Sequence, residues 1–260
     1  PKAGQGMNVS MGDGFNLGWK LAGVLRGHMP ESILLTYSAE RQGVAQDLID
    51  FDREWSRVIR ERNESDGDTP EFQRYFTKSG RYTAGMGVRY APSILTGEGT
   101  YQDLAKGFEI GTRFHSAPVI RAADGKRLHL GHVIKADGRW RLFAFEGAGG
   151  LAPAADAYAA LVDAYGGDVF DLCGIYQTGH HDLDTDIVPA VLRPPVGRLG
   201  LTDYEGVFCP DLARGDVFDL RGVDRTQGAM VVVRPDQYVA HLLPLGARDD
   251  LADFFAPVLL

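Results

Sequence analysis

The apolar positions of the first sixty residues recur at helical spacing and predict two helices. The first is expected over residues 7–26, with Gly27 and Pro30 as its stop signal. The second is expected from residue 33 to about residue 62, on the apolar positions Leu34, Tyr37, Val44, Leu48, Phe51, Trp55 and Val58. Its opposite face carries Glu40, Arg41, Asp47, Asp52, Arg53, Glu54 and Arg57. This pattern predicts a charged face in solvent, held by local ion pairs.

From about residue 107 the pattern changes to short strands and turns. Strands are predicted over 139–145, which alternates with period two, over 169–176 and 128–134, and more weakly over 112–120. An Ala-rich helix is predicted over 153–165 and a closing helix over 251–260. Two apolar runs at 229–233 and 238–242 flank Arg234-Pro235-Asp236-Gln237, which predicts a hairpin.

The order of these elements predicts a thioredoxin-like fold. Strand, helix, strand, an ill-defined crossover, hairpin and helix follow one another in that fold. After the first strand, where a redox-active member would carry Cys-x-x-Cys, the chain reads Glu146-Gly147-Ala148-Gly149-Gly150-Leu151. Without thiols this segment cannot exchange disulfides, so a structural role is expected.

Composition narrows the class of protein. The chain has 260 residues, of which 44% are hydrophobic and 24% charged, as in an ordinary soluble globular protein. Its net charge of −8 argues against a nucleic-acid surface, and no apolar run reaches membrane-spanning length. Two cysteines, Cys173 and Cys209, are too few for a disulfide framework and are expected to be buried free thiols. A cytoplasmic location follows as the default.

The first eight residues form the strongest candidate for a ligand site. They are a glycine-containing loop that feeds the first predicted helix. Gly4 and Gly6 lack a Cβ, so their backbone can turn sharply and lie against a flat ligand. The helix that follows presents N–H groups and the positive end of its dipole, which suits an electron-rich or anionic partner.

The amino-acid sequence of this stretch closely resembles one segment of the FAD-dependent aromatic hydroxylases. The branch that it resembles most contains phenol 2-monooxygenase and 3-hydroxybenzoate 4-hydroxylase. The residues concerned are Pro1-Lys2-Ala3-Gly4-Gln5-Gly6-Met7-Asn8, followed by Asp13, Asn16-Leu17 and Trp19-Lys20-Leu21. The resemblance implies that the loop lies along the flavin ring, with Gly4, Gln5, Gly6, Met7 and Asn8 facing its pyrimidine edge. It places Pro1 on the substrate side.

The resemblance also implies an activity for a larger protein. That protein would hydroxylate a phenolic aromatic of the phenol or hydroxybenzoate type with FAD, NAD(P)H and O2, as a homodimer. The family's nucleotide-binding and catalytic segments lie upstream, so no catalytic residue is expected in this chain, which alone should be inactive. Three regions are expected: 1–62 as the helical tail of the FAD-binding domain, 63–106 as a connection, and 107–260 as a thioredoxin-like α/β (α+β) domain. The alternative is a non-catalytic thioredoxin-like dimerisation or interaction module.

Three further clusters invite a functional interpretation. His180-His181-Asp182-x-Asp184-x-Asp186 has metal-binding residue types but is better interpreted as a solvated loop, and no metal is expected. His129 and His132 lie at odd spacing in a predicted strand, so they should face opposite sides. Arg81, Tyr82, Arg89 and Tyr90 could bind an anionic or aromatic ligand, but a connecting segment with its rings packed on the core is favoured.

Overall fold

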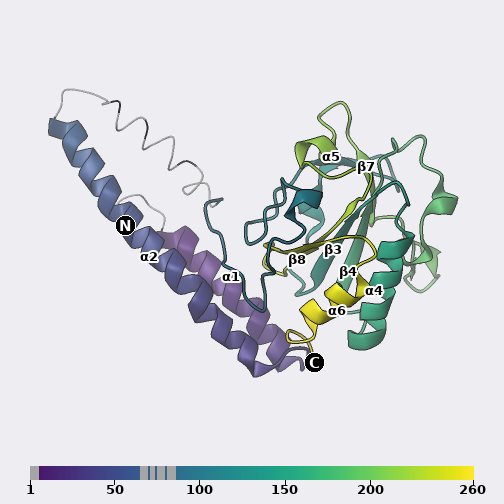
Figure 1. Cartoon of the computed structure of the whole chain (residues 1–260), viewed down its shortest axis with the longest axis horizontal. Helices are drawn as coiled ribbons and strands as arrows, with labels where there is room; N and C mark the ends of the chain where they lie inside the picture. Colours follow the sequence, from purple (N-terminus) through teal and green to yellow (C-terminus); the bar gives the residue numbers. More distant parts are fainter. Residues whose placement is uncertain (1–5, 65–69, 71–73, 75–79, 81–85) are drawn as a thin grey trace.

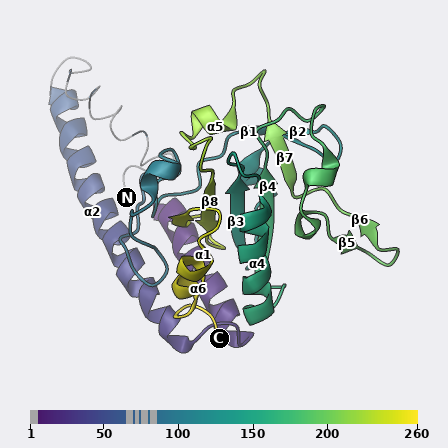
Figure 2. The ribbon, with the colours of Figure 1, turned by 45° about the vertical axis from the view of Figure 1, so that its right-hand side comes forward.

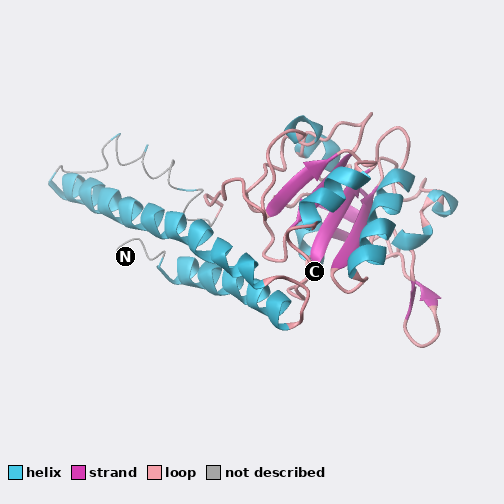
Figure 3. Cartoon of the chain, turned by 60° about the horizontal axis from the view of Figure 1, so that its bottom comes forward, coloured by secondary structure: helices cyan, strands magenta, loops and turns pink. Residues whose placement is uncertain are grey.

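The computed structural model describes residues 6–64, 70, 74, 80 and 86–260 (Figure 1). A pair of helices extends from one side of a compact α/β body. Helix α1 spans Gly6–Leu25, a 3-10 turn covers Glu31–Leu34, and α2 spans Leu35–Glu64. The two helices lie side by side (Figure 3). Both helices predicted from the spacing are therefore confirmed.

The body is built on a seven-stranded sheet of order β2-β1-β7-β4-β3-β8-β9. Its strands are β1 (Pro118–Arg121), β2 (Arg127–His129), β3 (Trp140–Phe145), β4 (Phe170–Ile175), β7 (Val207–Pro210), β8 (Ala229–Val233) and β9 (Val239–Leu243). Its helices are α4 (Ala152–Tyr165), α5 (Val217–Leu220) and α6 (Arg248–Phe255). A two-stranded hairpin of β5 (Pro195–Val196) and β6 (Leu201–Thr202) stands apart from the sheet (Figure 2).

Four neighbouring strands have the topology of a thioredoxin-like fold. Strand β3 pairs in parallel with β4, and α4 is the connection between them. On its other side β3 pairs antiparallel with β8, which in turn pairs antiparallel with β9. Helix α6 follows β9 and lies against α4. The predicted fold class, a mixed α/β body after a helical pair, is confirmed.

The other side of the sheet differs from the sequence prediction. Strand β7 lies between β1 and β4 and is fully buried, yet its short run ending in Pro210 predicts no strand. The predicted strand over 128–134 is wrong in its second half, where a 3-10 turn covers Leu130–Val133. All six residues of β3 are buried, because both faces of this central strand are covered.

Two apolar cores lie on the two faces of the sheet. One is covered by α4 and α6, and the other by the segment before β1 together with α5 (Figure 2). Helix α1 takes part in the first core through Trp19, whose ring meets the fully buried ring of Trp140 edge-on at 5.7 Å between centroids. The helical pair and the sheet therefore share one packed core.

Both cysteines lie in strands of the sheet. Burial raises the pKa of the Cys173 and Cys209 thiols, that of Cys209 to about 12. Because the thiolate is the reactive form, neither cysteine should react with a thiol reagent in the native protein at about pH 8, and both should react in urea. A colorimetric thiol titration checks this, and rapid labelling of the native protein would contradict the burial of these groups.

No helix among the described residues has the length and apolar character needed to cross a membrane.

Candidate functional site

The first turn of α1 carries no acidic side chain. Met7 and Met11 are 70% and 59% exposed there. Since none of its own carboxylates offsets the positive end of the helix dipole, this helix start suits an electron-rich or anionic partner. Gly6, Met7 and Asn8 of the predicted loop form this first turn, whereas Pro1, Gly4 and Gln5 lie outside the described residues.

A buried polar network lies behind this helix start. Its members are Asn16, Lys20, Glu40, Arg41, Tyr90, Arg234 and Asp236, together with the half-buried Asp13. The expectation that Glu40 and Arg41 face solvent is wrong, because they are only 9% and 6% exposed. This part of α2 packs against α1 and the β8–β9 turn, so the charges are paired inside the protein.

Glu40 is the centre of the network. Its Oε2 accepts hydrogen bonds from Asn16 Nδ2 at 2.7 Å, from Lys20 Nζ at 2.8 Å and from an Arg234 Nη atom at 2.9 Å. The other Arg234 Nη atom donates to Glu40 Oε1 at 2.5 Å. Arg234 also donates to both carboxylate oxygens of Asp236, at 3.0 and 2.7 Å. Each buried charge thus has a partner of opposite sign.

The charges in this network shift one another's pKa values. Burial alone would raise the pKa of Glu40, but the charges and hydrogen bonds of Arg234 and Lys20 outweigh it and hold that pKa at about 2. Burial would lower the pKa of Arg234, yet Asp236 and Glu40 raise it. Both groups therefore remain ionised throughout the physiological pH range.

Glu40 should make the stability of the chain depend on acid pH. A carboxyl with a pKa of about 2 in the folded state and 4.5 otherwise stabilises the fold above its ordinary pKa. This contribution is lost as the pH falls from about 5 to 2. Between about pH 6 and pH 3, the difference in unfolding free energy between the native chain and Glu40→Gln should shrink by about 2 kcal/mol. Urea unfolding at both pH values measures it, and a pH-independent difference would contradict the shifted pKa.

Arg41 connects the network to the first turns of α1. Its Nε donates to Asp13 Oδ1 at 2.6 Å, and one Nη donates to the carbonyl oxygen of Val9 at 3.2 Å. The other Nη donates to the hydroxyl of Tyr90 at 3.0 Å. A Cβ on Gly12 would lie 3.2 Å from an Arg41 Nη atom, so this glycine permits the close approach.

Aromatic rings surround the Arg234 guanidinium. Its Cζ lies 4.8 Å from the Tyr90 ring centroid, 5.5 Å from that of Trp19 and 5.9 Å from that of Tyr238. Such cation–π contacts strengthen when the cation is desolvated, as here. The predicted hairpin at residues 234–237 is confirmed, but its Arg234 and Asp236 point into the protein. In the sequence, Asn16 and Lys20 have i,i+4 spacing and therefore share one face of α1, a local signal that does not connect them to Glu40 or Arg234.

The favoured interpretation of the segment before the sheet holds for its described part. Tyr90 is 3% exposed and packs on Tyr238, with ring centroids 4.4 Å apart. Arg89 lies at the surface and pairs with Glu109 at 2.6 Å. Arg81 and Tyr82 lie outside the described residues.

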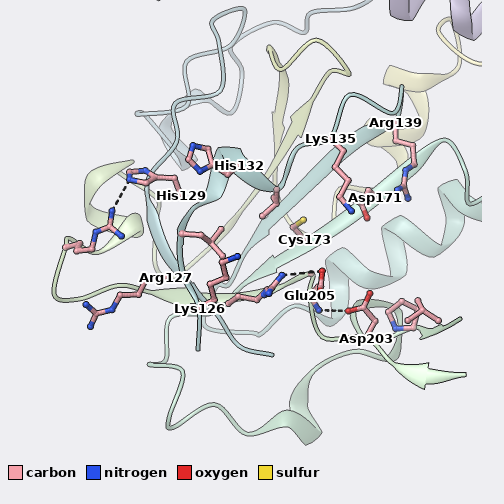
Figure 4. A pocket seen from close by; sticks show the side chains of 17 residues that line it. Lys126, Arg127, His129, His132, Lys135, Arg139, Asp171, Cys173, Asp203 and Glu205 are labelled. Atoms are coloured by element: carbon pink, nitrogen blue, oxygen red, sulfur yellow. Dashed lines mark hydrogen bonds and ion pairs between the residues drawn. The ribbon is translucent and has the colours of Figure 1, made fainter. Parts of the chain in front are cut away.

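A second candidate is a cationic pocket of about 760 Å³ beside β2 and β4 (Figure 4). It is lined by Arg121, Lys126, Arg127, His129, His132, Lys135, Arg139 and Arg214, with Asp171, Asp203 and Glu205 among them. Several of the arginines already pair with protein carboxylates, as Arg121 does with Asp124 at 2.6 Å. The pocket therefore offers a solvated surface on which several of the arginines are already paired.

The histidines do not assemble a metal centre. His129 and His132 do not face opposite sides as expected; their ring centroids lie 5.7 Å apart because His132 belongs to a 3-10 turn. The rings of His180 and His181 lie 3.9 Å apart between centroids, tilted by 39°, in a loop whose three aspartates are exposed, so the solvated-loop interpretation holds. Within the described ranges, no group of three or more His, Cys, Asp or Glu side chains could hold a metal ion.

Comparisons with known proteins identify the family. Residues 88–260 match the protein family described as phenol hydroxylase, C-terminal dimerisation domain, and residues 1–52 match the one described as FAD binding domain. The chain belongs to the phenol hydroxylase family of FAD-dependent monooxygenases. The buried polar network joins the two family regions, since Asp13 to Arg41 lie in the first and Tyr90, Arg234 and Asp236 in the second.

Individual relatives agree with this family. The chain is 51% identical to a 3-hydroxybenzoate 4-monooxygenase of Comamonas testosteroni, over 98% of the chain and 44% of that protein. It is 31% identical to the phenol 2-monooxygenase fsqG of Aspergillus fumigatus, over 98% of the chain and 45% of that protein. The chain thus spans less than half the length of these relatives.

Solved structures show the same fold. The flavin-dependent monooxygenase PieE, in complex with FAD and substrate, superposes with a TM-score of 0.64 at 21% identity. The match covers 98% of the chain and 44% of PieE. RebC superposes with a TM-score of 0.55, over 99% of the chain and 43% of RebC.

Proposed function

We propose that this chain is the C-terminal part of an FAD-dependent monooxygenase that hydroxylates a phenolic aromatic compound with NAD(P)H and O2. The observation that carries this proposal is the start of α1, which has an exposed Met7 and no acidic side chain in its first turn and lies in a segment that matches an FAD binding domain. The 51% identity to a 3-hydroxybenzoate 4-monooxygenase makes a hydroxybenzoate the first substrate to test.

The described residues fit a flavin at the start of α1. A flavin supplies the reduction and oxygen-activation chemistry, while the protein supplies placement and electrostatics. The N–H groups of Gly6, Met7 and Asn8 would stabilise negative charge on the pyrimidine edge of the ring. Gly4 and Gln5 would continue this contact, with Pro1 on the substrate side.

The α/β body would have a structural role. Residues 146–151 follow β3 and contain no thiol, so disulfide exchange is excluded at this position. The description of the matched family supports a homodimer formed through this domain. We divide the chain into the helical tail 1–62, the connection 63–106 and the thioredoxin-like domain 107–260. The two free, buried thiols support a cytoplasmic location.

The proposed activity is tested on the full-length protein that contains this chain. Purified protein should oxidise NADH or NADPH faster when 3-hydroxybenzoate or phenol is added, and mass spectrometry should find a product heavier by one oxygen atom. Benzoate, which lacks the phenolic hydroxyl, serves as the control and should yield no hydroxylated product. A flavin-free protein, or one that hydroxylates none of the phenols, would overturn the proposal.

A further inference from the structure

The side chain of Arg41, on α2, contacts two parts of the molecule that are far apart in sequence, the first turns of α1 and Tyr90. It donates to the carbonyl of Val9, in the first turn of α1, and to Asp13 one turn later. Its third partner is the hydroxyl of Tyr90, 49 residues away in the region that matches the dimerisation domain. Arg41 is therefore a direct link from that domain to the helix start.

Tyr90 is fixed to the body of the thioredoxin-like domain. Its backbone N–H donates to the carbonyl of Gly111 at 2.9 Å, and its ring packs on Tyr238, the residue before β9. Its hydroxyl also accepts a hydrogen bond from Asn16 Nδ2 at 3.3 Å. One buried phenol thus receives donors from both α1 and α2, and its own position is set by the sheet.

We propose that Tyr90 and Arg41 are positioning residues, through which the C-terminal domain sets the place of the first turn of α1 and thereby the affinity and reduction potential of the flavin. The inference rests on the proposed function, because it takes the helix start to be a flavin contact. It assigns the C-terminal domain a part in cofactor binding, in addition to the dimerisation for which its family is named.

The chemistry of the contact supports a positional role. Arg41 is 6% exposed, and a guanidinium has five N–H donors in a rigid fork. Removal of the Tyr90 hydroxyl leaves one arm of this fork without its partner in a buried site. Arg41 can then rotate to find another acceptor, and its bond to the Val9 carbonyl moves with it. When the Val9 carbonyl moves, the backbone N–H groups of the same turn move with it. A small displacement of such donors changes how strongly they stabilise a ligand.

The first test is Tyr90→Phe in the full-length flavoprotein, which keeps the ring against Arg234 and Tyr238. We expect FAD to bind about tenfold more weakly and the flavin midpoint potential to shift. The control is Tyr101→Phe, which removes a hydrogen bond to Asp250 at 3.0 Å in the same domain and lies outside the buried polar network. It should leave FAD binding and the potential unchanged.

The second test changes the same contact from the side of α1. Gly12→Ala places a Cβ 3.2 Å from Arg41, whereas Gly14→Ala meets nothing within 4 Å. Both substitutions favour the helix, by about 1 kcal/mol relative to glycine. We expect weaker FAD binding and a shifted flavin spectrum only in Gly12→Ala.

The outcomes separate this inference from the proposed function. If Tyr90→Phe and Gly12→Ala keep native FAD affinity and potential, the inference is overturned, even if either variant melts at a lower temperature. If the unaltered full-length protein binds no FAD, the proposed function fails, and the inference with it.

Discussion

Replacement of Glu40 by glutamine should lower the free energy of unfolding by about 3–5 kcal/mol. Glutamine has nearly the same shape, but it removes the negative charge that Lys20 and Arg234 share. Both cations are fully buried, with no exposed surface, so water cannot replace the lost partner. The amide N–H₂ would also face at least one donor, the Arg234 Nη atom that donates to Glu40 Oε1. Urea unfolding followed by circular dichroism measures the change.

A matched control lies on the same helix. Glu54 pairs with Arg57 at 2.7 Å, but both side chains are nearly half exposed. Glu54→Gln should therefore change the unfolding free energy by no more than about 0.5 kcal/mol. Equal effects of the two substitutions would show that the Glu40 network contributes no more than a surface ion pair.

Replacement of Trp140 by alanine should cost about 3–5 kcal/mol of stability. Its ring has no exposed surface and meets Trp19, Phe254 and Phe255 edge-on, with centroids 5.7, 6.1 and 5.1 Å away. Loss of the indole leaves a cavity where α1, β3 and α6 pack together. Urea unfolding of Trp140→Ala should thus show a lower unfolding free energy for the helical pair as well as for the sheet.

An exposed apolar residue provides the control for this substitution. Leu25, at the end of α1, is 85% exposed, so Leu25→Ala should stay within about 0.5 kcal/mol of the native chain. If Trp140→Ala were as stable as Leu25→Ala, the common core between the helical pair and the sheet would not exist.

The elements that the sequence predicts correctly are those with a strong local pattern. Helices α1, α2 and α4 and strands β3, β4, β8 and β9 each have several periodic positions and clear stop signals. Strand β7 is short and ends in a proline, and only its neighbours β1 and β4 make it a strand. The predicted orientation of His132 is wrong because the residue lies in a 3-10 turn. Over so few residues, alternation cannot distinguish such a turn from a strand.

The candidate site, too, could be predicted only where its residues belong to a local sequence pattern. The helix start at Met7 and Asn8 could be predicted from the order of residues alone, and Gly6, expected in the loop before it, belongs to the first turn as well. The buried polar network behind this helix start could not be predicted, because a charged helix face has the same sequence pattern whether it faces water or other charges. Glu40 and Arg234 are 194 residues apart, and neither has a local feature that predicts the other. Long-range pairing of this kind is set by the packing of α2 against the β8–β9 turn.

The location of the flavin tests the central claim most directly. A crystal structure of the full-length protein with FAD bound should show the pyrimidine edge of the flavin against the backbone N–H groups of Gly6, Met7 and Asn8. The Arg41 side chain should still join Val9 to Tyr90 behind them. A flavin bound elsewhere, with the start of α1 facing solvent, would contradict the account.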